Sequence, residues 1–158
     1  MTFDASALLN QTVEGPMATQ VKPIPEGEYM ARIGSEEDDV KIESFAGTKD
    51  PSKTYYRLTL MWEIIDENLK AALERDKITV RDQFLLDVDP ISGQLKTGPD
   101  DNVSLGQRRE AVGLNDGSPF SIPMFRGRGP AMLRIRHRAN DKDPQIKYAE
   151  VARVVKLG

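Results

Sequence analysis

The sequence predicts a mainly β protein with five strands and one helix between the third and fourth strands. Two observations lead to this prediction. Apolar and polar residues alternate with a period of two in several segments, which is typical of half-buried strands. Clusters of Gly, Pro and Asp separate those segments, as expected of turns. A chain of 158 residues fits a single domain with a sizeable core.

Residues 1–22 are predicted to form a flexible N-terminal tail. A short helix is expected over Ala5–Gln11, but Gly15-Pro16 interrupts any continuation. The alternative interpretation is that the tail docks onto a partner. The domain itself is predicted over residues 23–158. It would begin with a turn at Pro23–Gly27, where proline fixes φ and glycine permits positive φ.

The first predicted strand covers Glu28–Gly34 and Val40–Phe45 as one long strand, bent at Ser35–Asp39. The second, Thr54–Asp66, has the clearest alternation. One side of it carries Tyr56, Leu58, Leu60, Trp62 and Ile64. We therefore expect Trp62 in the core and the intervening residues on the outer face.

The later segments complete the predicted order. They are a short extra helix, a third strand, a longer helix, and two strands joined by a hairpin-like turn: Glu67–Asp76, Lys77–Val88, Asp100–Val112, Ala131–Arg138 and Ile146–Lys156. This order is the connectivity of a five-stranded OB-fold-like barrel. Because strand order does not fix strand pairing, a β-sandwich remains an alternative.

Composition excludes several kinds of chemistry. The chain has no Cys and one His, so disulfides, Cys-based zinc sites and multi-His metal sites are not expected. It contains neither a phosphate-binding P-loop motif nor a Gly-x-Gly-x-x-Gly motif. We expect no catalytic residue, no bound metal, no cofactor and no membrane span, and hence a binding protein rather than an enzyme.

Taken for the whole chain, the net charge of −3 argues against a nucleic-acid partner. The charge is, however, distributed unevenly along the chain. Residues 1–66 have a net charge of −6, residues 67–105 of −3 and residues 106–158 of +6. The basic last third therefore restores a nucleic-acid partner as a hypothesis.

Arginines dominate the candidate binding residues in this basic third. Arg134, Arg136 and Arg138 alternate along one predicted strand and should project from the same face. The preceding loop supplies Phe125, Arg126 and Arg128. Guanidinium groups bind phosphates and stack on bases. The alternative is a solvated face paired with acidic residues. His137 is interpreted as a hydrogen-bonded residue near the strand end, without a catalytic role.

A second group of candidates lies on the second and third predicted strands, which form the oligonucleotide-binding face of OB-folds. Tyr55 and Arg57 should point outward from the second strand, and Arg81 from the third. Lys49, Lys53 and Lys142 lie in the loops that flank such a face. Together these residues predict stacking and phosphate contacts along one surface.

Three motifs support a family resemblance: Pro23-Ile24-Pro25-x-Gly27-x-Tyr29, then LTLMWEIID at 58–66, then AVGL at 111–114. With the closing hairpin, they resemble small phage-encoded single-stranded DNA-binding proteins of replication and recombination. The resemblance covers residues 21–156. It implies sequence-tolerant binding of single-stranded DNA, no catalysis, and a location in the cytoplasm of a bacterial host. Implied protein partners are phage or host replication and recombination proteins.

Two points stay open from the sequence. The chain could form a homo-oligomer. It could also be a phage virion or assembly protein whose barrel only contacts other proteins, in which case the arginines would pair with acidic residues of a neighbouring subunit.

Overall fold

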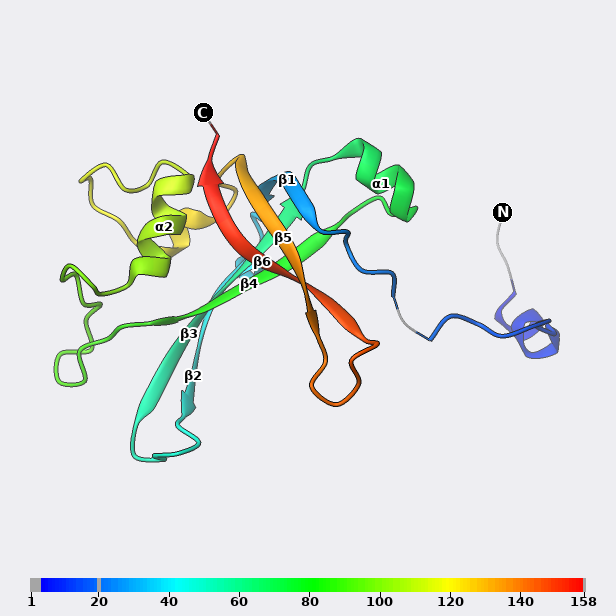
Figure 1. Cartoon of the computed structure of the whole chain (residues 1–158), viewed down its shortest axis with the longest axis horizontal. Coiled ribbons are helices and arrows are strands. Elements are labelled where there is room, and N and C mark those ends of the chain that lie inside the picture. Colours follow the sequence, from blue (N-terminus) through cyan, green and yellow to red (C-terminus); the bar gives the residue numbers. More distant parts are fainter. Residues whose placement is uncertain (1–3, 20, 158) are drawn as a thin grey trace.

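The computed structural model describes residues 4–19 and 21–157 of the chain (Figure 1). It confirms a mainly β fold, built on one antiparallel sheet. The strands are β1 Gly27–Ile33, β2 Val40–Ala46, β3 Thr54–Ile64, β4 Thr79–Leu86, β5 Ala131–Ala139 and β6 Lys147–Lys156. Their order is β2-β3-β1-β5-β6, and β4 pairs with β3. The long β3 is thus the centre of the fold, since β1, β2 and β4 all pair with it.

The described strands number six, so the prediction of five is wrong in one place. The expected first strand is divided into β1 and β2 by a 3-10 turn at Glu37–Asp39. The Asp39 carboxylate accepts a hydrogen bond from the Glu36 backbone N–H at 2.9 Å. A Cβ atom at Gly34 would collide with that carboxylate. The absence of a side chain at Gly34 therefore allows the chain to turn here instead of continuing as one bent strand.

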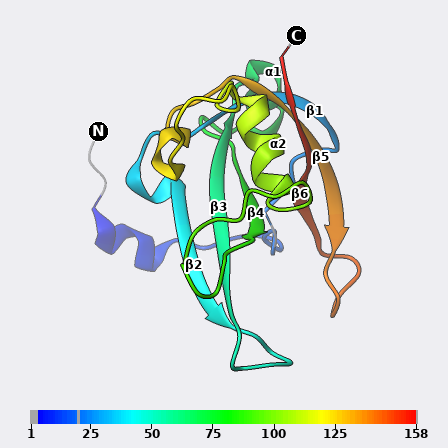
Figure 2. The same cartoon turned by 90° about the vertical axis from the view of Figure 1, so that its left-hand side faces the viewer.

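The sheet is strongly curved, so that strands β4 and β6 approach each other without pairing (Figures 1 and 2). β4 and β6 lie close together, but within the described part of the chain no ladder of backbone hydrogen bonds links them. The predicted five-stranded barrel is therefore not confirmed, because the sheet has six described strands and does not close. An opening between β4 and β6 remains, and side chains from both strands line it.

In the described part of the chain, two α-helices accompany the sheet. The short α1, Glu67–Leu73, follows β3 and buries Leu69. The longer α2, Val103–Ala111, packs against β4 and β6. It begins three residues later than predicted, because Asn102 adopts a left-handed backbone conformation with φ of 52°. The Asn102 side chain then holds the preceding loop, donating to the carbonyls of Asp87 and Lys96 at 2.8 Å each.

The core lies between the inner faces of the curved sheet and α2. Its largest fully buried members are Trp62, Phe125, Ile33, Leu58, Leu60, Ile64, Ile78, Leu133 and Ile135. The prediction that Trp62 is a core residue is confirmed. The prediction that Phe125 stacks on bases is wrong, because its ring is fully buried and packs edge-on against Phe120 at 5.2 Å between centroids.

The hairpins β2–β3 and β5–β6 extend toward the same end of the molecule (Figures 1 and 2). In Figure 1 the N-terminal segment runs to the right of the β5–β6 hairpin, whereas the β2–β3 hairpin lies to the left of it. The N-terminal segment contains a short 3-10 helix at Ala5–Asn10. All its described residues from 4 to 19 are exposed. Residues 1–3 and 20 of the predicted tail lie outside the described residues. None of the described helices has the length and apolar character needed to span a bilayer.

Candidate nucleic-acid interface

Two aromatic rings lie side by side on the outer face where the β2–β3 hairpin leaves the sheet. Phe45 on β2 and Tyr55 on β3 are directly opposed. Their rings stack with centroids 5.8 Å apart and an interplanar angle of 25°. Both are partly exposed, at 39% and 38%. The pair offers a flat aromatic surface on which a planar ring could stack.

Arg57 is fixed next to this aromatic pair. Its guanidinium lies 5.3 Å from the centre of the Phe45 ring and donates to the Glu43 carboxylate at 3.0 Å. Lys41 lies 3.7 Å from the same carboxylate. The hydrogen bond from Arg57 is the main reason that the pKa of Glu43 lies below its usual value. Glu43 is therefore ionised at neutral pH and holds Arg57 in place.

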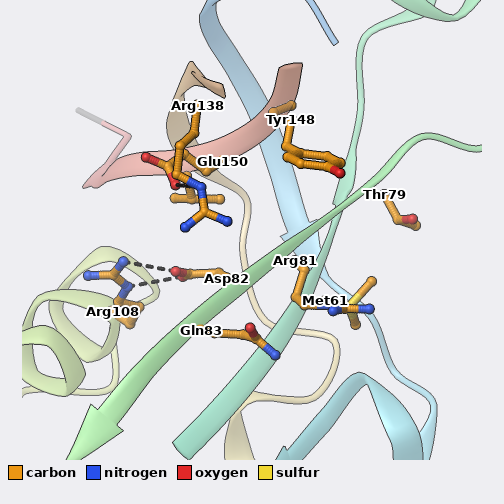
Figure 3. Close-up of a pocket in the computed structure, with 11 residues that line it drawn as sticks. Met61, Thr79, Arg81, Asp82, Gln83, Arg108, Arg138, Tyr148 and Glu150 are labelled. Carbon is orange, nitrogen blue, oxygen red and sulfur yellow. Dashed lines mark hydrogen bonds and ion pairs between the residues drawn. The ribbon is translucent and has the colours of Figure 1, made fainter. Parts of the chain in front are cut away.

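A pocket of about 590 Å³ occupies the opening between β4 and β6 (Figure 3). Arg81 lines it from β4, next to Met61 of β3, while Arg138 on β5 and Tyr148 on β6 line it on the other side of β4 in this view. Glu150 lies between the arginines of β5, accepting from Arg136 at 2.6 Å and lying 3.8 Å from Arg138. Arg136 is thus neutralised by Glu150, whereas Arg81 has no ion pair within 4 Å among the described residues.

The inner wall of this pocket is a buried ion pair. Asp82 projects inward from β4 and is 3% exposed. It accepts two hydrogen bonds from Arg108 on α2, at 2.9 and 3.0 Å, and one from the Trp62 indole at 3.1 Å. The Arg108 guanidinium also lies 4.9 Å from the Phe84 ring. These contacts fix α2 against the sheet and give the pocket a rigid wall.

The hairpin loops place lysines at the two ends of this surface. Lys49 and Lys53 line a recess with Phe45 and Tyr55. Lys142 lines another recess with Arg138 and Tyr148. The residues between the two recesses belong to β3, β4 and the pocket of Figure 3. We call the pocket, the two recesses and the arginines beside them the groove face; it comprises Phe45, Lys49, Lys53, Tyr55, Arg57, Arg81, Arg136, Arg138, Lys142 and Tyr148.

Three of the predicted arginines lie elsewhere. Arg126 donates to the carbonyl of Glu37 at 3.2 Å, next to the start of β2. Arg128 donates to the carbonyl of Met124 at 3.3 Å in the same region. Since β2 rises about 3.3 Å per residue over its seven residues, both lie roughly 20 Å from the hairpin loop at its other end. Arg134 is exposed on β5, but its neighbours on the adjacent strands are Glu28 and Arg153, and it does not line the pocket.

His137 has the structural role that was predicted. Its Nε2 atom lies 2.6 Å from the carbonyl oxygen of Ile24, and its Nδ1 atom lies 3.8 Å from Glu26. The ring thus ties the segment before β1 to β5. Among the described residues there is also no cluster of three or more potential metal ligands.

Sequence reasoning missed several residues that the structure brings to this surface. Phe45 and Tyr148 follow the outward alternation of their strands, so the signal was present in the spacing. Asp82 also gave a signal, because it interrupts the inward apolar positions of β4. Its partner Arg108 could not be found in this way, since it lies 26 positions away on a helix.

Comparisons of the chain with protein-family models, with curated proteins and with solved structures found no match.

Proposed function

We propose that this protein binds single-stranded DNA with little sequence preference, along the groove face. The observation that carries the proposal is the arrangement of this surface. A stacked aromatic pair and unpaired cations line a pocket and two recesses that lie between two lysine-bearing hairpins. Aromatic platforms combined with a basic track are how proteins hold single strands without reading their sequence.

The fold that best accommodates this function is an OB-type barrel. In this interpretation β1 and β2 together correspond to its first strand, and β3, β4, β5 and β6 to the remaining four. OB-folds are partly open Greek-key barrels, so the gap between β4 and β6 is compatible with this interpretation. Their second and third strands and two flanking loops bind oligonucleotides. In this chain, those elements are β3, β4 and the hairpins that carry the lysines.

Each part of the groove face would have a separate role in binding. Phe45, Tyr55 and Tyr148 would stack on successive bases, each contributing about 1–3 kcal/mol. Arg81 and the hairpin lysines would contact phosphates, whereas the charge of Arg138 is offset by Glu150, 3.8 Å away. Stacking and phosphate contacts do not distinguish one base from another, which is consistent with sequence tolerance. A role in phage replication or recombination follows from the motif resemblance and is part of the same proposal.

The test is fluorescence anisotropy with a labelled oligo-dT of about 30 nucleotides. Tyr55→Ala should weaken binding by roughly 5- to 150-fold, because it removes one stacking platform. Arg81→Gln should also weaken binding. Arg128→Gln is the matched control, since Arg128 is an exposed arginine outside the groove face. Equal loss for Arg81→Gln and Arg128→Gln would show that the bound surface has been assigned wrongly.

The salt dependence adds a quantitative check. Lys49, Lys53, Arg81 and Lys142 have no ion pair within 4 Å in the described part of the chain. Four phosphate contacts predict a slope of log K against log salt of about −3 for a single strand. Absence of binding to oligo-dT at low salt, with folded protein in excess, would reject the DNA proposal in favour of the assembly-protein alternative.

A further inference from the structure

A row of apolar side chains crosses the outer side of β1, β5 and β6. Met30, Met132 and Val155 are directly opposed across these three strands. Ile65 extends the row past β1, because its backbone N–H donates to the Met30 carbonyl at 2.8 Å. Met30 and Val155 are each 39% exposed and Ile65 is 38% exposed. An apolar row of this kind, bordered by polar residues, is typical of a contact surface.

A row of charged residues runs beside the apolar row, one outward position further along the strands. It consists of Glu28 on β1, Arg134 on β5 and Arg153 on β6. All three are exposed, and in the described part of the structure none has an ion pair within 4 Å. The row therefore has an acidic end and a basic end, both available to a partner.

We propose that this surface, which we call the Met30 face, binds a second copy of the same chain. A two-fold contact uses the same patch on both subunits, so each residue must suit its symmetry mate. When the two-fold axis runs parallel to β5, strand β1 of one copy lies opposite strand β6 of the other. Glu28 then opposes Arg153 of the second copy, and this pair occurs twice. The apolar rows cover each other, with Met30 against Val155 of the second copy.

The position of Arg134, which the groove face leaves out, opposes this arrangement. At the axis, Arg134 faces its own symmetry mate, and the two like charges weaken the contact. The neighbouring Glu28 side chains offset part of that repulsion. The proposal therefore makes a counterintuitive prediction, because removing the Arg134 charge should strengthen the dimer.

The size of the surface sets the expected affinity. Four strand positions about 4.8 Å apart, and two rows about 7 Å apart along the strands, cover roughly 270 Å² of flat area per copy. Stable complexes bury about 800 Å² per partner, so the dimer should be weak and reversible. A dissociation constant in the micromolar range corresponds to about −8 kcal/mol at most.

The test is sedimentation velocity of the whole chain without DNA, over about 5 to 200 µM, a range that brackets such a constant. The parent chain should shift from monomer to dimer. Met30→Glu should raise the dissociation constant at least about tenfold, because it places a carboxylate among apolar side chains. Ile91→Glu is the matched control, since Ile91 is 96% exposed in the loop after β4. The emission of the buried Trp62 reports whether each variant is folded.

A charge exchange distinguishes this dimer from any other. Glu28→Arg and Arg153→Glu should each weaken the dimer, and the double variant should restore it. Arg134→Gln should lower the dissociation constant. A parent chain that stays monomeric at the highest concentration would overturn the proposal, and so would a double variant weaker than both single variants. Because no groove-face residue is involved, these results are independent of DNA binding.

Discussion

The buried Asp82–Arg108 pair makes a strong prediction about stability. Asp82→Ala leaves the Arg108 guanidinium without its carboxylate, although Arg108 is only 8% exposed. It also leaves the Trp62 indole N–H without its acceptor. Removing one partner of a buried ion pair costs about 3–5 kcal/mol, and an unsatisfied buried donor about 1–3 kcal/mol. Because these costs overlap in one network, we expect a total loss of about 4 kcal/mol.

This loss would be large for the whole protein. Domains of this size unfold with about 5–15 kcal/mol, and 1 kcal/mol corresponds to roughly 2–4 °C in Tm. Asp82→Ala should therefore lower the Tm by about 8–16 °C. Urea unfolding followed by the emission of Trp62 measures the same loss directly, since Trp62 is the only tryptophan and contacts Asp82.

Two further variants make the reasoning refutable. Asp76→Ala changes an exposed carboxylate and should alter stability by less than about 0.5 kcal/mol. The double variant Asp82→Ala/Arg108→Met removes both charges, so it should be more stable than Asp82→Ala alone. If Asp82→Ala costs less than about 1 kcal/mol, or the double variant is less stable than the single one, the buried pair does not hold α2 as described.

Two other predictions follow from the structure. Glu43→Gln should tighten binding of oligo-dT several-fold, because it removes a negative charge from the groove face and releases Arg57 for phosphate. The depressed pKa of Glu43 means that it is fully ionised above its ordinary pKa, so the gain should be the same at pH 6 and pH 8; a gain found only at pH 8 would contradict this. Asn102→Ala should cost about 2–3 kcal/mol, since it removes buried hydrogen bonds at a left-handed position. The Asn102→Gly variant avoids the backbone cost but still loses the hydrogen bonds, so it should lose less stability than Asn102→Ala. Thermal unfolding of the two variants would check this difference.

Alternation along single strands was enough to predict the inner and outer faces of β3 and β5. It assigned Trp62 to the core and Arg138 to the surface, and both assignments are confirmed. The reason is that a one-residue change of register would invert a whole strand, so a strand with one buried face specifies its orientation locally.

Prediction failed where tertiary contacts outweigh local pattern. Phe125 precedes an exposed Arg-Gly loop, yet it is buried because Phe120 and the core lie beneath it. The split between β1 and β2 depends on how the Asp39 carboxylate fits against Gly34, which no alternation of hydrophobicity records. The grouping of Arg81 with Arg138 depends on β4 meeting β6, strands that are far apart in the sequence.

The structure also changes what the basic residues predicted to contact phosphates imply. Ten basic residues were candidates for phosphate contacts, and all ten acting together would give a salt slope of about −7. In the structure Arg57 is paired with Glu43, and Arg136 and Arg138 are paired with Glu150, while Arg126, Arg128 and Arg134 lie off the groove face. Binding would then depend less on charge and more on stacking at Phe45 and Tyr55. A slope near −3 with a large loss for Tyr55→Ala supports this division, whereas a slope near −7 with little loss for Tyr55→Ala would place the DNA on the whole basic surface instead.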